Sequence, residues 1–197
     1  MAGGQSSSDN SLVVVDPIEA EYLGEIPGTG HEAAPARLFD DNFLKYLPAP
    51  LREPRRAWLA ILTGWALSIV GSIALAALAK AVAPQLPTPE FPLKGPTAFL
   101  LLVAFAPFLE TLIMAGFLSL FLRFMPPAAA ILLSAAGWGV AHSLEALGWG
   151  LVIWWPFLIF STLFVVWRQR GFWAGVAIAA TTHALQNVGP AWVVAFG

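Results

Sequence analysis

Four polar side chains in the C-terminal half of the chain have the residue types that hydrolytic chemistry needs. Each interrupts a long apolar run: Glu110 in "FAPFLETLIMAGF", His142 in "GWGVAHS", and His183 with Asn187 in "TTHALQN". A carboxylate and an imidazole around one water act as a general base, and further donors such as His and Asn stabilise an oxyanion. The set predicts hydrolysis of an amide bond within or at a membrane.

The positions of these residues bear on how they could act together. An ionisable side chain in the middle of a bilayer is costly, so it normally faces a bundle interior or a water-filled cavity and marks function. His183 and Asn187 are four residues apart, so on a helix they project from one face. The structural alternative for each residue is a buried hydrogen-bonding link between helices. The functional interpretation therefore requires three separate segments to bring the four side chains together.

The composition is that of an integral membrane protein. Of the 197 residues, 58% are hydrophobic and 11% are charged, and the mean hydropathy is +0.72, well outside the range of ordinary soluble domains. The lack of Cys excludes disulfides, thiolate metal sites and a cysteine nucleophile. Beyond residue 96 the Asp, Glu, Lys and Arg residues are few: Glu110, Arg123, Glu145, Arg168 and Arg170.

Five apolar runs have about the 20 residues that cross the hydrocarbon core of a bilayer. They predict an all-α fold, a polytopic membrane helix bundle with about five transmembrane helices. The runs cover about residues 57–82, 97–124, 127–146, 149–167 and 171–196.

The chain divides by composition into a tail and a membrane domain. Residues 1–56 are polar, acidic and rich in Gly, Pro and Ser, with short apolar islands such as "SLVVV" and "FLKYL". This composition predicts a largely disordered cytoplasmic tail with one short docking segment. Residues 57–197 form the predicted transmembrane helical domain. The first 20 residues lack the pattern of a secretory signal peptide.

Positive residues near the ends of spans favour the cytoplasmic side. We therefore expect the N-terminus in the cytoplasm and the C-terminus in the periplasm, because this pattern and the lack of a signal peptide suit a bacterial inner membrane. Lys80 and Lys94 lie in the opposite loop and do not fit this orientation, but they are far apart in the sequence and the same loop carries Glu90. The clusters that would share the cytoplasmic side are Arg52 with Arg55 and Arg56, Arg123, and Arg168 with Arg170.

This orientation allows the depths of the four polar residues to be compared. At about 1.5 Å per residue from the cytoplasmic end of each span, Glu110 and His142 lie about 21 and 22 Å deep. On the same scale, His183 and Asn187 lie about 18 and 24 Å deep. The four residues are therefore predicted to lie in one layer and to form one site.

At these residues the sequence resembles the CPBP family of intramembrane proteases, which includes CaaX prenyl endopeptidases and abortive-infection and bacteriocin-processing proteins. The first family motif is Pro, two residues, EExxxR and Gly, and "PFLETLIMAG" keeps Pro107, Glu110 and Gly116. The second, FxxxH, appears as "WGVAH", with Trp138 in place of Phe and His142 retained, and the third, HxxxN, is intact as "HALQN". The three motifs occur in order on three separate spans.

The resemblance implies that Glu110 and His142 activate the attacking water, while His183 and Asn187 stabilise the oxyanion. It also implies an endopeptidase that cuts a membrane-embedded or lipid-modified protein. Two positions depart from the motif, because Thr111 and Ala115 stand where the family has Glu and Arg. These departures keep a second interpretation open, a degenerate relative that acts as a scaffold, chaperone or subunit of a membrane complex and docks a partner protein through the tail.

We expect no bound cofactor, no metal and no nucleic-acid partner; the surroundings are the lipid bilayer. Two His and a Glu are a donor set that Zn²⁺ accepts, but Asn187 favours an oxyanion role for His183. Two His at one depth on different spans are also the arrangement that a b-type haem needs. That model ranks lowest, since it gives no reason for Glu110.

Overall fold

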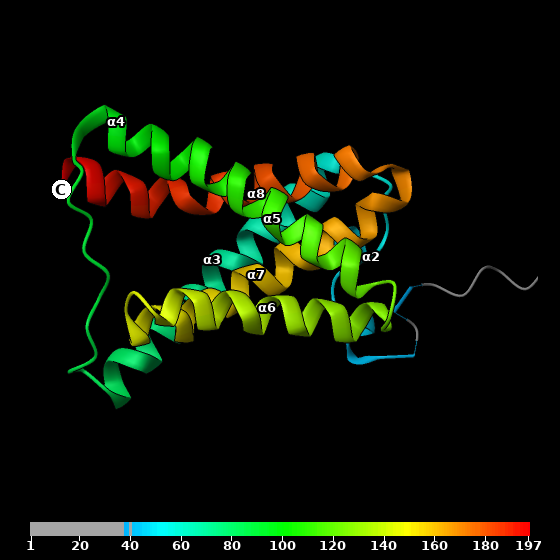
Figure 1. The fold of residues 1–197 in the computed structure, drawn as a ribbon, viewed down its shortest axis with the longest axis horizontal. Coiled ribbons are helices and arrows are strands. Elements are labelled where there is room, and N and C mark those ends of the chain that lie inside the picture. Colours follow the sequence, from blue (N-terminus) through cyan, green and yellow to red (C-terminus); the bar gives the residue numbers. More distant parts are fainter. Residues whose placement is uncertain (1–37, 40) are drawn as a thin grey trace, which may run out of the picture. The chain divides into compact units, whose positions relative to one another are not determined.

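The computed structural model describes residues 38, 39 and 41–197, and all structural statements below concern these residues. In this part of the chain the regular elements are all helical, which confirms the predicted all-α bundle. Five long helical segments coincide with the five predicted apolar runs (Figure 1). The segments are α3 (Ala57–Val82), the continuous helix formed by α4 (Gly95–Leu100), η2 (Leu101–Phe105) and α5 (Ala106–Phe121), α6 (Pro127–Ser143), α7 (Leu147–Trp167) and α8 (Phe172–Phe196).

Three helices of the described chain are long and apolar enough to cross a membrane. They cover Ala57–Val82, Gly95–Phe121 and Leu147–Arg170, with 26, 27 and 24 residues and mean hydropathies of 2.0, 2.2 and 2.0. The third includes the short 3-10 helix η3 (Arg168–Arg170) that follows α7. The protein is therefore a membrane protein, and α6 and α8 complete its helix bundle.

Helix α7 lies at the centre of the bundle. It packs against α6, α3 and α8, and every residue from 156 to 167 is buried. A helix that is apolar all round is expected in such a position, because it has no face that requires water. The other long helices surround α7, and the site described below lies against its buried half.

The bundle extends on its N-terminal side beyond the predicted boundary at residue 57. Two short helices, η1 (Phe43–Tyr46) and α2 (Ala49–Arg52), precede α3, and α2 packs against α3 and α7. Leu44 and Leu51 are only 1% and 0% exposed, so burial of these two side chains accounts for the docking. The segment "FLKYL" thus belongs to the folded unit, whereas residues 1–37 and 40 of the predicted tail lie outside the described residues.

Helices α6 and α7 form a close pair because small residues face each other. A Cβ atom on Gly150 would overlap the Ser143 hydroxyl and the Gly139 carbonyl oxygen. Ser143 also donates a hydrogen bond to the Gly139 carbonyl oxygen at 2.9 Å. Small residues allow this approach in membrane bundles, where helices associate mainly through packing.

We predict that Gly150→Ala destabilises the protein by about 1 to 3 kcal/mol, because the added methyl group must separate α6 from α7. Gly137→Ala, on α6, is the matched control, since a Cβ there meets no atom within 4 Å in the described structure. The measurement is the free energy of unfolding of both variants in mild detergent. Equal stability of the two variants would show that the close contact is not required.

Candidate active site

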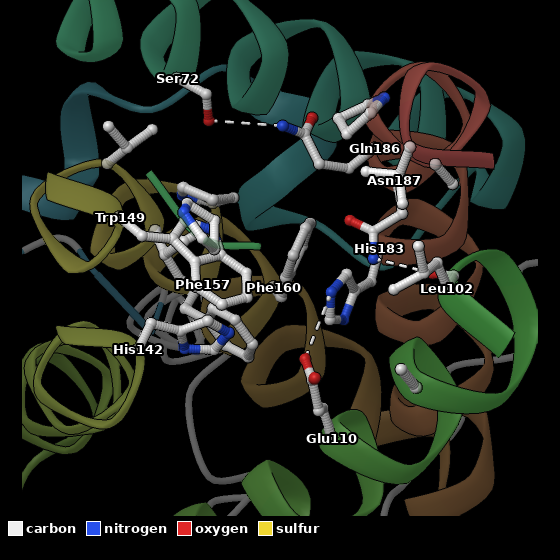
Figure 2. A pocket seen from close by; sticks show the side chains of 18 of the residues that line it. Ser72, Leu102, Glu110, His142, Trp149, Phe157, Phe160, His183, Gln186 and Asn187 are labelled. Carbon is white, nitrogen blue, oxygen red and sulfur yellow. Dashed lines mark hydrogen bonds and ion pairs between the residues drawn. The ribbon is translucent and has the colours of Figure 1, made fainter. Parts of the chain in front are cut away.

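A cavity of about 280 Å³ lies between the five long helices and the loop of residues 83–94. Glu110, His142, His183 and Asn187 all line it, although they come from three helical segments far apart in the sequence (Figure 2). Most of the wall is aromatic or aliphatic, from residues such as Phe91, Trp149, Val152, Ile153, Phe157 and Phe160. The arrangement is a small apolar chamber with a few polar side chains, which is typical of ligand sites.

The carboxyl group of Glu110 faces the imidazole of His183. Their Oε2 and Nε2 atoms are 3.6 Å apart, and the side chains are 27% and 5% exposed, respectively. The distance is slightly longer than a hydrogen bond. The ring of His183 is stacked on Phe160 with centroids 4.5 Å apart, which holds it toward Glu110.

The tautomer of His142 follows from its hydrogen bond. Its Nδ1 atom lies 2.9 Å from the backbone carbonyl oxygen of Trp138, one turn earlier on α6. A carbonyl only accepts, so Nδ1 carries the hydrogen and Nε2 of the neutral ring has a free lone pair. Trp149 packs edge-on against this ring with centroids 4.6 Å apart. His142 is thus presented to the cavity as a hydrogen-bond acceptor, the form that a general base requires.

Phe157 separates the two histidines. Its ring centroid lies 5.6 Å from that of His142 and 5.2 Å from that of His183. The space between the imidazoles is therefore filled by a phenyl ring, whereas ligation of a haem by both histidines needs a free slot there. In residues 38, 39 and 41–197, no group of three or more His, Cys, Asp or Glu side chains is arranged to hold a metal ion.

The helix that carries Glu110 contains one π-helical turn, η2, directly before Pro107. The N–H of Ala106 donates to the carbonyl of Leu101, five residues earlier. Pro107 has no N–H, so it cannot donate to the carbonyl of Val103 in an α-helix or to that of Leu102 in a π-helix. Proline at this point frees backbone acceptors inside an apolar bundle, and such acceptors need a partner from elsewhere.

Asn187 supplies that partner. Its Nδ2 atom donates a hydrogen bond of 3.0 Å to the carbonyl oxygen of Leu102, so α8 is tied to η2 beside the cavity. The amide group has two hydrogens, and this bond uses one of them. The structure thus places Asn187 at the cavity and gives it a helix-linking contact that the spacing of "HALQN" does not indicate.

The two positions that depart from the family motif lie away from the chamber. Thr111 and Ala115 are both 0% exposed and are packed in the interior of the bundle. They follow Glu110 by one and five residues, so they face a different side of α5. The chamber therefore contains a single carboxyl group from this motif, and the neighbouring positions contribute packing.

Two polar residues of the cavity wall, Gln186 and Ser72, were not identified by sequence reasoning. Gln186, on α8, is 9% exposed, and its Nε2 atom donates to the hydroxyl of Ser72 on α3 at 3.3 Å. Both residues line the cavity. The spacing does contain a signal for Gln186, because it follows His183 by three residues and so lies on the same face of α8. Ser72 has no comparable signal, since single Ser residues are common in membrane helices.

Comparisons of the chain with models of known protein families, with curated proteins and with solved structures find no match. The resemblance to the CPBP family accordingly rests on the three short motifs alone.

We predict that Pro107 and Asn187 are energetically coupled. Asn187→Leu removes the donor to the Leu102 carbonyl, whereas Pro107→Ala restores an N–H near the freed carbonyls. Loss of Asn187 should therefore cost about 1 kcal/mol less in the Pro107→Ala background than in the wild type. A double-mutant cycle on the free energy of unfolding in mild detergent measures this difference. Additive effects would show that the hydrogen bond does not compensate for the proline.

Proposed function

We propose that the protein is an intramembrane endopeptidase of the CPBP type, which hydrolyses a peptide bond in a membrane-embedded or lipid-modified protein. The observation that carries this proposal is the contact of 3.6 Å between Glu110 Oε2 and His183 Nε2, in an apolar chamber that His142 and Asn187 also line. A haem site does not account for this combination, because it gives no role to Glu110.

The proposed reaction begins with one water in the chamber. Glu110 and His142 act together on this water: one of them accepts a single proton while the water oxygen attacks the carbonyl carbon of the scissile amide, which yields a tetrahedral intermediate. The intermediate collapses, the C–N bond breaks, and the proton passes to the departing amine. The Nδ1–H of His142 bonded to Trp138 supports the role of base, because it leaves Nε2 as the proton acceptor.

The oxyanion of the intermediate requires hydrogen-bond donors. His183 lies next to Glu110, and the second amide hydrogen of Asn187 is not used by the bond to Leu102. In an apolar chamber such donors stabilise developing charge more strongly than in water. The aromatic and aliphatic walls suit the apolar side chains or acyl groups of a membrane-associated substrate.

The altered first motif is compatible with activity. In the family, the second Glu and the Arg occupy the positions of Thr111 and Ala115, and here both positions are fully buried outside the chamber. Replacing one partner of a buried ion pair is strongly destabilising, but replacing both with packing residues is tolerated. The two changes occur together, so neither leaves an unpaired charge in the bundle.

The proposed location is a bacterial inner membrane with the N-terminus in the cytoplasm. Support comes from the end of the bundle where α2, the connection after α5 and η3 lie together, because these segments carry or adjoin the Arg clusters (Figure 1). The loop of residues 83–94 and the C-terminus lie at the opposite end. Phe91 from this loop lines the chamber, so the chamber would approach the periplasmic side.

A second candidate is a non-catalytic scaffold or subunit. The hydrogen bond from Asn187 to Leu102 favours it, because a residue of the third motif then holds helices together. Under this proposal a fixed-ratio complex copurifies in mild detergent, and variants of Glu110 leave its formation and function unchanged.

We predict that Glu110→Gln lowers kcat at least about a hundredfold, because it removes a general base without changing the size of the side chain. Thr111→Val is the matched control: it is a neighbouring isosteric change in the packed interior, for which we expect about wild-type activity. Each protein is reconstituted with a set of single-span and acylated or prenylated peptides in H₂¹⁸O. Mass spectrometry then measures ¹⁸O in new carboxyl termini.

Hydrolysis by the Glu110→Gln variant at the wild-type rate would contradict the peptidase proposal. A second contradicting result has two parts. The wild-type protein yields no ¹⁸O-labelled product, and the Glu110→Gln variant supports the cellular function as well as the wild type does.

A further inference from the structure

Gln186 carries an unused hydrogen-bond acceptor beside the proposed active site. Its side chain is buried and lines the chamber, and its Nε2 atom is held by Ser72. Its Oε1 atom is also buried, yet it has no hydrogen-bond partner within the described chain. Leaving a buried carboxamide oxygen unpaired costs about 1 to 3 kcal/mol. A ligand that brings a donor into the chamber would recover this energy.

The position of Gln186 suggests which donor that is. It lies three residues after His183 on α8, which is about 4.5 Å along the helix axis. An extended peptide advances about 3.3 Å per residue. A peptide that runs along α8 with its scissile carbonyl at His183 and Glu110 would therefore bring a backbone N–H, one or two residues away, to the level of Gln186.

The carboxamide can meet this donor without rearranging the bundle. Hydrogen bonding to Ser72 on α3 holds the group at the chamber wall. The terminal torsion of a Gln side chain is broad. A rotation about it would turn the buried Oε1 toward the chamber and release Nε2 from Ser72, while the stem of the side chain stays in place.

We propose that Gln186 is a substrate-binding residue, whose Oε1 accepts a hydrogen bond from a backbone N–H next to the scissile bond. This inference rests on the proposed peptidase function and names the part of the substrate that the site recognises. Because the bond is made to the main chain, it would select an extended peptide segment and leave the side-chain sequence free. Apolar side chains would be accommodated by the aromatic walls.

The test measures binding without cleavage, in the full-length Glu110→Gln protein in lipid nanodiscs. The probe is a tritium-labelled N-decanoyl trileucine amide, and two analogues each replace one internal N–H with an ester oxygen. We expect one of the two esters to bind about tenfold more weakly than the amide, because the ester oxygen cannot donate to Gln186. Adding Gln186→Met should reduce this difference to about twofold or less.

Trp155→Phe is the control for loosened helix packing. Trp155, on α7, donates a hydrogen bond of 2.9 Å to the carbonyl of Leu67 on α3. Like Gln186, it therefore links a second helix to α3. This variant should keep the tenfold preference for the amide, since its side chain lies outside the chamber.

Three results would overturn the assignment: no saturable binding of the amide probe, equal binding of the amide and both esters, or a preference that survives Gln186→Met. Equal binding is also the result expected if water alone satisfies Oε1. The assay breaks no bond, so it separates the two proposals. An amide preference that depends on Gln186, without Glu110-dependent hydrolysis, would retain the peptide site and refute the peptidase.

Discussion

The missing N–H of Pro107 is the constraint on which the site depends. In an apolar bundle, a backbone carbonyl without a protein donor cannot form a hydrogen bond to water instead. The chain meets this with a π-helical turn at residues 101–105 and with the amide of Asn187, which bonds to the Leu102 carbonyl. This contact ties the helix of Glu110 to α8, the helix of His183. Glu110 follows Pro107 by three residues, so the geometry of this turn also sets the direction of its carboxyl group.

The buried half of α7 determines how far apart the polar groups are. Phe157 contacts both imidazoles, and Phe160 stacks on that of His183. These rings keep the two histidines on different parts of one chamber and exclude direct contact between them. The chamber stays apolar as a result, which strengthens the effect of each donor and acceptor that faces it.

Under the proposed function, a single carboxyl group acts together with polar groups from other helices. His142 is held as an acceptor by its own helix, and His183 lies at the carboxyl group of Glu110. The positions of Thr111 and Ala115 belong to the packing of α5 with its neighbours. The two residues of the first motif that differ from the family are therefore packed in the interior of the bundle. The residues that match the family motifs and line the chamber are Glu110, His142, His183 and Asn187.

The sequence by itself determined the helices, because apolar runs of membrane length allow only one regular structure, and residues 57–196 have the predicted five. It also identified Glu110, His142, His183 and Asn187, since polar groups in such runs are costly and few. Tertiary structure alone decided that Glu110 faces His183. It also decided that Asn187 donates a hydrogen bond to the Leu102 carbonyl and that Gln186 donates one to Ser72. These pairings join residues up to 114 positions apart. They depend on how helices rotate and approach one another, which spacing along one helix does not specify.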